Sequence, residues 1–508
     1  MRALISVYDK SGLVPFARGL VDLGFELVAS GGTAAALEEA GLVVTSVEDV
    51  TGFPEMLHGR VKTLHPRIHA AILARRDVAE DRGSLKKHGI EPFDLVCVNL
   101  YPFARIAAEP GAGENEIIEM IDVGGPAMLR AAAKNHGSIT AVCQLEDYDT
   151  VLTELRADGM TSIETRRRLA AIAFATTAAY EAAIASWFQA EPFPGTISLA
   201  FDKAHELAYG ENPHQQAAYY AERGRRTHLL ARVEQLRGKP LSFNNLNDLS
   251  AARLLAREFD DPVCVIVKHT NPCGVAAAAT IEEAYAGALV ADPVSAYGGV
   301  VVLNRAVSAA LGEALADQFV EVLFAPGYDE QAMETLAHKT SMRILNNTER
   351  RTLTDEPDYR RVLGGLLVQE RDWEVAGRED MRVMCGEVSD AHWDELLFAW
   401  RVVKHVTSNA IVVARGGQTI GIGAGQMSRV DAVRIALDKA RELGHSLEGA
   451  VLASDAFFPF ADGPQLALDA GVAVLVQPGG SKRDDEVIEA VSRAGAAMVF
   501  THRRHFRH

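Results

Sequence analysis

The pair Lys268 and His269 follows the apolar run VCVIV (263–267) and opens the polar loop HTNPCG. A neutral imidazole at the end of a buried strand can act as a general base, because its ordinary pKa lies at about 6.5. A lone histidine in such a place is more often structural. The adjoining lysine and the Asn271-Pro272 turn favour chemistry. The sequence therefore predicts a proton-transfer site at this strand end.

A glycine turn near the N-terminus suits an anion. ASGGT (29–33) ends one apolar run and opens a helical segment, where backbone N–H groups and the helix N-terminus favour negative charge. An ordinary strand-to-helix turn has the same pattern. Polar residues at the end of the preceding apolar run support the anion site, because ligands of open parallel sheets bind at the carboxyl ends of strands. The candidate contacts are Ser6, Lys10, Gly31, Gly32 and Thr33.

The segment FPEMLHGRVKTLHP (53–66) is rich in polar donors. Arg60, Lys62 and Thr63 are interspersed with apolar residues, so they could face one phosphate or form a solvated basic strand. His65 and His69 stand four apart, a spacing that can bind metal on a helix. A proline lies between them and no HExxH pattern exists, so we expect no metal site.

Three further residues of the first part could move protons. Tyr101 follows the buried run LVCVNL (95–100), and Asp122 precedes a Gly-Gly break before a helix that carries Lys134. A carboxyl group, a phenol and ammonium groups suit acid–base steps in a ring closure. By spacing alone they form a loose constellation.

Two loops of the second part could contact a ligand. GIGAGQMSR (421–429) lacks the third glycine of a dinucleotide loop, but its glycines permit close backbone approach and Arg429 is a candidate anion contact. SDAFFPFAD (454–462) carries Phe457 and Asp462, which could flank a flat heterocycle or belong to ordinary core packing. The zinc-deaminase pattern of HxE with PCxxC is absent from the sequence, so a metal-activated water is not supported.

Composition limits the class of protein. The 508 residues suggest about three folding units, at roughly 150 residues each. With 51 Lys+Arg against 68 Asp+Glu, the net charge of −17 argues against a general nucleic-acid binder. We expect no signal peptide and no continuous apolar run that spans a membrane. Five scattered cysteines without a CxxC pair favour a reducing cytoplasm.

The pattern of apolar runs predicts an α/β protein. Short continuous apolar runs alternate with helical segments, which indicates a parallel sheet covered by helices in the first 160 residues. A long helix is predicted over 161–189, and the breakers EPFPG (191–195) mark a domain boundary. VIVKHTNPCG (265–274) and RVVKHVTSNA (401–410) share a Lys-His pair, a weak sign of two related subdomains. The charged stretch 340–395 reads as a linker or insertion.

Taken together, the motifs resemble the bifunctional purine biosynthesis family, in which IMP cyclohydrolase is joined to AICAR transformylase. The resemblance is collinear over essentially the whole chain and rests on ASGGT, GFPEMLHGRVKTLHP, NLYPF, IDVGGPAMLRAAAKNH, YGENPHQ, VKHTNPCG, DPVSAYGG, GIGAGQMSR, SDAFFPF and RHFRH. It implies a methylglyoxal-synthase-like cyclohydrolase domain over 1–195. It also implies a transformylase domain over 196–508, made of two cytidine-deaminase-like α/β subdomains without zinc, roughly 196–375 and 376–508.

The resemblance implies two reactions, which are the last two steps of IMP biosynthesis. Formyl transfer from 10-formyltetrahydrofolate to AICAR would use His269 as base, Lys268 to help protonate the leaving folate nitrogen, and Asn409 to support the oxyanion. Ring closure of formyl-AICAR would use Lys62, Tyr101, Asp122 and Lys134. The implied substrate contacts in the first domain are Ser6, Lys10, Gly31, Gly32, Thr33, Arg60 and Thr63. Those in the second domain are Tyr209, Tyr297, Gly298, Arg429, Phe457, Asp462 and Arg504.

The same resemblance implies a cytoplasmic homodimer that acts on small molecules and binds neither nucleic acid nor membrane. No tightly bound cofactor is implied, although the family suggests a structural potassium ion. The chain departs from the family at Ala208, where an arginine that approaches the AICAR phosphate is usual; Lys239 or Arg237 could replace it. Two alternatives stay open: an enzyme with only one working activity, and a nucleotide-binding regulator.

Overall fold

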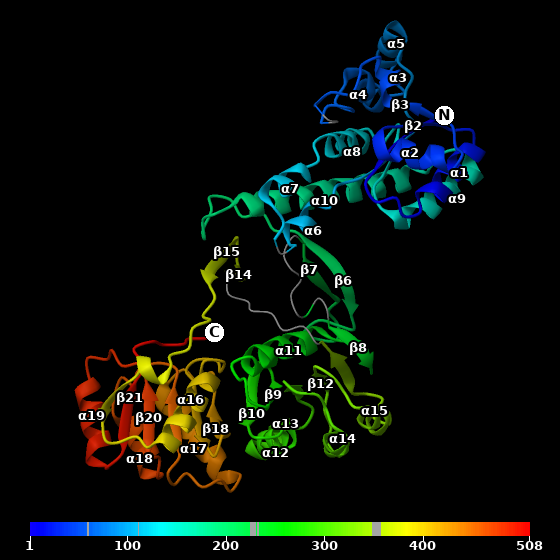
Figure 1. Ribbon diagram of the computed structural model, residues 1–508. Coiled ribbons are helices and arrows are strands. Elements are labelled where there is room, and N and C mark those ends of the chain that lie inside the picture. Colours follow the sequence, from blue (N-terminus) through cyan, green and yellow to red (C-terminus); the bar gives the residue numbers. More distant parts are fainter. Residues whose placement is uncertain (58–59, 110, 224–229, 231–232, 348–356) are drawn as a thin grey trace. The chain divides into compact units, whose positions relative to one another are not determined.

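A computed structural model describes residues 1–508 except 58–59, 110, 224–229, 231–232 and 348–356 (Figure 1). The chain forms two compact units. Unit 1 is Met1–Asp202 with Ala221–Thr227, and unit 2 is Lys203–Tyr220 with His228–His508. The predicted domain boundary at 191–195 and the subdomain boundary near 375 stay predictions.

Unit 1 contains a five-stranded sheet in which all strands are parallel, as predicted. In spatial order its strands are β3 (Val44–Ser46), β2 (Glu26–Ala29), β1 (Arg2–Val7), β4 (Leu95–Asn99) and β5 (Thr140–Val142). Because side chains alternate along a strand, neighbouring residues such as Leu4 and Ile5 enter cores on opposite faces. Both faces are therefore buried, which explains the continuous apolar runs.

Helices cover both faces of this sheet (Figure 1). One face packs on α1 (Leu13–Asp22) and α9 (Tyr148–Asp158). The other packs on α4 (Pro66–Leu73), α8 (Gly124–Lys134) and α10 (Ile163–Phe188). The remaining helices of this unit are α2 (Gly31–Glu39), α3 (Val47–Thr51), α5 (Ala79–His88), α6 (Phe103–Ala107), α7 (Glu114–Glu119) and the 3₁₀ turn η2 (Leu145–Asp147).

The long helix α10 confirms the predicted helix at 161–189. It begins after Ser162, whose hydroxyl oxygen accepts a hydrogen bond from the N–H of Thr165 at 3.1 Å. Among the described residues, α10 is the one helix long and apolar enough, by length and composition, to cross a membrane. Its sequence is not one continuous apolar run, because Thr176, Thr177 and Glu181 interrupt it. Its buried residues, such as Ala170 and Ala173, pack beside α8 and the sheet as part of the core of unit 1.

Unit 2 is built around a twelve-stranded sheet with a repeated plan. Its order is β16-β21-β20-β19-β17-β18-β10-β9-β11-β12-β13-β8. Read outward from the central β10–β18 pair, each half has an antiparallel hairpin, three mutually parallel strands and one antiparallel edge strand. The first half comprises β8 (Glu234–Arg237), β9 (Val263–Lys268), β10 (Asn271–Ala277), β11 (Val300–Leu303), β12 (Val322–Ala325) and β13 (Arg343–Asn346). The second comprises β16 (Arg382–Cys385), β17 (Ile411–Arg415), β18 (Gln418–Gly423), β19 (Val451–Ser454), β20 (Val474–Gln477) and β21 (Ala497–Phe500).

Helices repeat in the same way. One face of the sheet carries a continuous core with α11 (Phe243–Ala256) from the first half and α16 (Asp390–Val403) from the second. The other face packs on α12 (Ile281–Ala291), α14 (Ala309–Ala316) and α15 (Glu330–Leu336) in the first half, and on α17 (Arg429–Glu442), α18 (Asp462–Asp469) and α19 (Asp484–Arg493) in the second. The short α13 (Pro293–Ala296) and η4 (Arg378–Asp380) are the other helical segments of this unit among the described residues.

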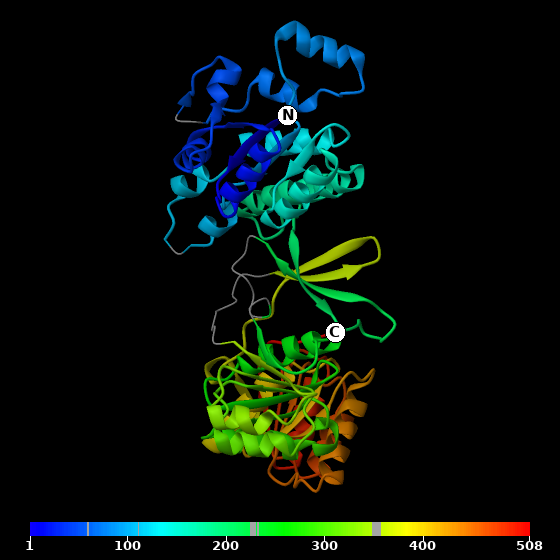
Figure 2. The same ribbon diagram turned by 90° about the vertical axis from the view of Figure 1, so that its right-hand side faces the viewer.

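Two hairpins form sheets of their own, β6 (Phe201–Leu207) with β7 (Ala217–Glu222), and β14 (Pro357–Val362) with β15 (Gly365–Glu370) (Figure 2). The predicted linker over 340–395 is therefore wrong for part of its length. Its ends supply β13 and β16 to the large sheet, because the apolar residues of Arg343–Asn346 are buried against β12 and β8. The β14–β15 hairpin is the inserted part.

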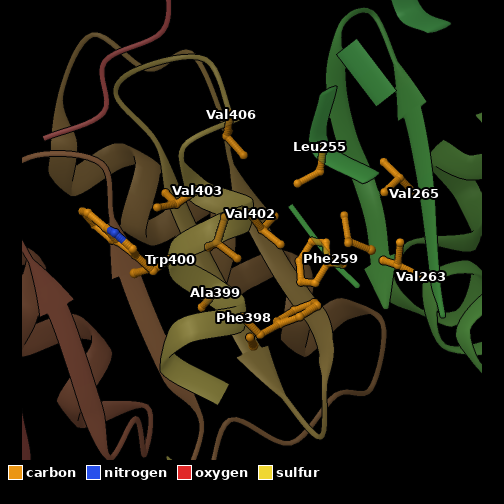
Figure 3. Close-up of a cluster of buried hydrophobic side chains, with 14 of the residues drawn as sticks. Leu255, Phe259, Val263, Val265, Phe398, Ala399, Trp400, Val402, Val403 and Val406 are labelled. Atoms are coloured by element: carbon orange, nitrogen blue, oxygen red, sulfur yellow. The ribbon is translucent and has the colours of Figure 1, made fainter. Parts of the chain in front are cut away.

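The Lys-His echo does not mark equivalent positions. Lys268 ends the strand β9 and His269 follows it, whereas Lys404 and His405 follow the helix α16. The residues that flank the second pair, Val403 and Val406, belong to the core that α11 and α16 share. In this core Phe259 and Phe398 lie 5.5 Å apart between ring centroids (Figure 3). The duplication is carried by the strand order and not by this motif.

Glu258 joins that second pair to the first half of unit 2. Its Oε1 atom lies 3.1 Å from Lys404 Nζ and 2.8 Å from His405 Nε2, and all three side chains are largely buried. Burial lowers the pKa of His405 despite the neighbouring carboxylate, and the Lys404 and Arg507 charges lower it further. His405 is therefore neutral in the folded chain near pH 7.

The lowered pKa predicts a loss of stability in acid. Between that pKa and about 6.5, the unfolded chain binds more protons at His405 than the folded chain does, so stability falls as pH falls. We expect His405→Gln to reduce the slope of unfolding free energy against pH, by no more than about 1.4 kcal/mol per pH unit. Urea unfolding of unit 2 at pH 7.5 and 5.5 measures it, with the exposed His338→Gln as control. Equal slopes in the wild type and His405→Gln would contradict this expectation.

Candidate functional site

The loop after β1 is held by a residue that the sequence analysis did not select. Asn99, at the carboxyl end of β4, accepts hydrogen bonds at Oδ1 from the N–H groups of Tyr8 at 2.6 Å and Asp9 at 3.1 Å. Its Nδ2 donates to the carbonyl of Asp9 at 2.8 Å. Asp9 in turn accepts from the Ser11 N–H and hydroxyl at 2.9 and 2.7 Å, which lowers its pKa. The loop that carries Lys10 is thus fixed at the sheet edge.

Lys10 and Lys62 converge on the glycine turn at the start of α2. A Cβ built on Gly31 would lie 3.0 Å from Lys62 Nζ, and one on Gly32 would lie 3.7 Å from Lys10 Nζ. Gly31 has a φ of 53°, which favours glycine. Two ammonium groups beside a helix N-terminus attract an anion strongly.

Thr33 ties this turn to β1. Its buried hydroxyl donates to the carbonyl of Val7 at 3.1 Å and accepts from the Val7 N–H at 3.0 Å. A hydroxyl has one proton to donate, so in this arrangement Thr33 positions the turn. Ser6 lies next to Val7 in β1 and is half-buried.

The basic segment 60–63 brings its cations into contact with carboxylates. Lys62 Nζ lies 2.6 Å from Glu55 Oε2, and the exposed Arg60 pairs with Glu119. Thr63 is buried against the start of α8. A Cβ built on Gly124 would lie only 2.6 Å from Thr63 Oγ1, so the threonine contacts the helix at a position where only glycine fits. His58 and Gly59 of the same motif lie outside the described residues.

His65 and His69 are not arranged as metal ligands. His65 Nδ1 accepts from the Arg67 N–H at 3.1 Å and caps α4. Burial lowers the pKa of His69, while a hydrogen bond from its ring to the backbone carbonyl of Thr63 acts against this effect. In the described residues, no group of three or more His, Cys, Asp or Glu is placed to hold a metal ion.

Asp122 and Tyr101 form a partly buried acid pair beside the start of α8. Asp122 Oδ1 accepts from the Gly125 N–H at 2.8 Å, and the Asp122 N–H donates to Tyr180 Oη at 2.7 Å. Burial raises the pKa of Asp122, while the Gly125 hydrogen bond lowers it less. Burial also raises the pKa of Tyr101, and the charges of Asp122 and Tyr8 add to this effect. A carboxyl group with a raised pKa beside a phenol is suited to proton transfer.

Lys134 lies at the far end of the same helix. The eleven residues of α8 span about 15 Å, so the helix separates Lys134 from Asp122. The structure therefore brings together Lys10, Lys62, the glycine turn, Thr63, Asp122 and Tyr101, but places exposed Lys134 apart from them.

In unit 2, Lys268 and His269 stand at the tip of the β9–β10 hairpin. Lys268 Nζ donates to the carbonyl of Tyr297 at 2.8 Å, next to Gly298, whose N–H donates to Phe319 at 2.7 Å. This fixes the ammonium group beside the exposed His269. A cavity of about 240 Å³ adjoins the pair and is lined among others by Lys268, His269, Cys273, Asp292, Ser295 and Lys439.

The loop of Asn409 is built from buried polar contacts. Asn409 Oδ1 accepts from Arg429 Nη2 at 2.7 Å, and its Nδ2 donates to the carbonyl of Gln426 at 2.8 Å. Arg429 Nη1 donates to Ser454 at 2.8 Å and pairs with Asp455. Arg429 is buried, and its contact with Oδ1 fixes the side chain of Asn409. This positioning role is separate from the predicted contact of Arg429 with an anion.

Asn271 links the His269 hairpin to the Asn409 loop. Its Oδ1 accepts from the N–H of Thr407 at 2.8 Å, and its Nδ2 donates to the carbonyl of His269 at 3.3 Å. Asn271 and Thr407 are 136 positions apart in sequence, so spacing gave no sign of the contact.

The other predicted substrate residues of unit 2 lie on several different elements. Phe457 is partly exposed two residues after Asp455, and Asp462 begins α18. Arg504 is exposed and stacks over Phe506 at 4.5 Å, next to His505, whose N–H donates to Asp455 at 3.0 Å. Tyr209 accepts at its carbonyl from the first residue of α11, Phe243, at 3.1 Å.

Two family descriptions match the chain. The AICARFT/IMPCHase bienzyme family matches residues 132–439, and the MGS-like domain matches residues 12–127. The order agrees with a methylglyoxal-synthase-like domain in front of a mixed α/β domain.

Curated relatives match along the full length. A protein of Cereibacter sphaeroides named bifunctional purine biosynthesis protein PurH is 51% identical over 530 residues, covering 100% of this chain and 98% of its own. A protein of Persephonella marina with the same name is 49% identical over 515 residues, covering 100% and 99%. The crystal structure of ForH covers 37% of this chain and 99% of its own at 39% identity, with a TM-score of 0.34, which is too low to support an argument.

Proposed function

Since the chain belongs to the AICARFT/IMPCHase bienzyme family, we propose which of its residues perform each of the two reactions. The enzyme transfers a formyl group from 10-formyltetrahydrofolate to AICAR, giving formyl-AICAR and tetrahydrofolate, and then closes formyl-AICAR to IMP with loss of water. The observation that carries the assignment is that proton-moving groups form two clusters, one in each unit.

Formyl transfer takes place at the β9–β10 hairpin. The 5-amino nitrogen of AICAR attacks the formyl carbon while His269 removes an amine proton. The bond from that carbon to the folate nitrogen then breaks, and Lys268 helps to protonate the departing nitrogen. The contact of Lys268 with Tyr297 at 2.8 Å supports a fixed position for this ammonium group. Asn409, held by Arg429, stabilises the negative oxygen of the intermediate, a contribution of about 3–4 kcal/mol in other enzymes.

Ring closure takes place in unit 1. The substrate phosphate lies at the glycine turn between Lys10 and Lys62, where the helix N-terminus and two cations attract it. The carboxamide nitrogen attacks the formyl carbon, and water leaves after proton transfers that involve Tyr101 and Asp122. Because this attack is intramolecular, positioning supplies much of the acceleration. A role for Lys134 rests on the family resemblance alone, since α8 separates it from Asp122.

The remaining substrate contacts follow the same division. In unit 1 they are Ser6, Gly31, Gly32, Thr33, Arg60 and Thr63. In unit 2 they are Tyr209, Tyr297, Gly298, Arg429, Phe457, Asp462 and Arg504. The ligands are AICAR, formyl-AICAR, IMP and folate, and we propose that the enzyme acts in the cytoplasm. We assign no residues to the potassium ion that the resemblance suggests.

The two activities should separate by mutation. We expect His269→Ala to abolish formyl transfer while supplied formyl-AICAR still closes to IMP, because no ring-closure group lies in unit 2. Lys62→Ala and Asp122→Asn should slow closure at least about a hundredfold and leave formyl transfer intact. A coupled assay that follows tetrahydrofolate and IMP measures both rates. Loss of both activities in a folded single variant would contradict the division.

We propose that the enzyme is a homodimer through unit 2. Several large apolar side chains at or beside the proposed substrate residues are exposed, which supports a partner surface there. They are Val294, Tyr297, Met427 and Phe457. Sedimentation at assay concentration should give a dimer, and dilution to monomer should reduce formyl transfer without reducing ring closure. A monomer with full formyl transfer would contradict the proposal.

Lys239 replaces the arginine that is missing at Ala208. The N–H of Ala208 donates to the carbonyl of Leu241 at 2.8 Å. The exposed Lys239 lies only two residues before Leu241 in sequence, so its backbone is near Ala208. A lysine side chain there can reach a phosphate beside Ala208.

This compensation gives opposite expectations for two variants. Loss of a charge-assisted contact worth about 1.5–3 kcal/mol should weaken AICAR binding roughly ten- to hundredfold in Lys239→Ala. Ala208→Arg should leave AICAR affinity unchanged or weaken it, because the place is already cationic. Calorimetric titration with AICAR measures both, with ring closure as control. Tenfold tighter binding in Ala208→Arg would mean that the phosphate site lacks a cation.

A further inference from the structure

The turn that carries His269 has an unusual backbone. His269 and Thr270 have φ angles of 52° and 63°, and Lys268 pairs with Asn271 across them. This is a two-residue hairpin in which both central residues are left-handed, a conformation that favours glycine or asparagine. A β-branched residue such as Thr270 is rarely found there.

The second half of unit 2 contains the equivalent turn with glycines. Between β17 and β18, Gly416 and Gly417 have φ angles of 64° and 72°, and Arg415 pairs with Gln418 across them. The repeated fold therefore contains both a low-strain version and a strained version of one turn. Strain of this kind persists only when surrounding contacts hold it, and it is concentrated at functional sites.

Asp248 supplies the contact that holds the strained turn. Its Oδ1 atom accepts a hydrogen bond from the Thr270 N–H at 2.7 Å, from the middle of α11. Burial raises the pKa of Asp248, while backbone hydrogen bonds from Thr270 and His269 lower it. On the other side, Asn271 Nδ2 donates to the carbonyl of His269. The second-half turn has two glycines in place of His269 and Thr270 and so carries no comparable strain.

We infer that Asp248 is a positioning residue for formyl transfer: it binds the backbone N–H groups of the His269–Thr270 turn and so aims the imidazole. The inference rests on the proposed role of His269 as the base. Asp248 touches no reacting atom and acts through the turn. Without it, the turn relaxes toward negative φ, and His269 leaves the position where it can take the amine proton.

The test compares Asp248→Ala with Asp248→Asn in the full chain. We expect Asp248→Ala to lower kcat for formyl transfer about ten- to hundredfold with a small change in KM for AICAR. Asp248→Asn keeps an acceptor oxygen and should lose less. Ring closure of supplied formyl-AICAR in the same protein should be unchanged, and the exposed Asn247→Ala on the same helix is the matched control.

Rescue by glycine separates positioning from a general structural role. Thr270→Gly relieves strain at φ 63°, so the double variant with Asp248→Ala should regain at least tenfold of the lost kcat. If Asp248→Ala does not fold, the same comparison is made with Asp248→Asn. Full activity in Asp248→Ala, or no rescue by Thr270→Gly, would overturn the inference. Activity that survives His269→Ala would instead overturn the proposed function.

Discussion

The buried pair of Arg429 and Asp455 is the interaction on which the geometry around Asn409 depends. Asp455 is wholly buried, and its carboxylate accepts from Arg429, from the Ser408 hydroxyl at 2.5 Å and from the Ala410 N–H at 3.1 Å. Removing one partner of such a pair typically costs about 3–5 kcal/mol, because the other charge is left without compensation. The network therefore fixes the backbone on both sides of Asn409 as well as its amide.

Unit 2 consists of two halves with a common plan, and the proposed transformylase residues lie on both of them. Both halves have the same order of strands, and β10 pairs with β18 at the centre, so the hairpin ends and loops beside that seam belong to different halves. Fold symmetry alone would make the two halves alike. The proposed base lies where the two halves differ: His269 and Thr270 stand where the other half has Gly416 and Gly417. The turn with two glycines is unstrained, whereas the turn that carries the imidazole of His269 is strained.

Much of the fold could be predicted from sequence because burial on two faces leaves a direct pattern. The runs at 263–267 and 300–303 are strands, the run at 472–476 overlaps β20, and the parallel sheet of unit 1 follows from its apolar runs. The two Lys-His pairs do not lie at equivalent positions of the two halves, because similarity over a few residues does not encode whether a strand or a helix precedes them. Asn99 and Asp248 were missed because they act on backbone groups 91 and 22 residues away, which no local spacing reveals. Lys134 was grouped with Asp122 by closeness in sequence, whereas α8 separates them in space.

The candidate anion site of unit 1 explains how a protein with a negative net charge can bind a negatively charged substrate. At a net charge of −17, free cations would be needed to attract a phosphate, yet Lys62 pairs with Glu55 and Arg60 with Glu119. The exposed Arg60–Glu119 pair contributes little, about 0–1 kcal/mol, so a phosphate dianion can displace Glu119 at small cost. The helix N-terminus at Gly31 stays oriented whether or not the lysines are paired, because Thr33 fixes the turn to β1. The fixed helix N-terminus therefore gives the proposed phosphate site a defined position that does not depend on the pairing of the side-chain charges.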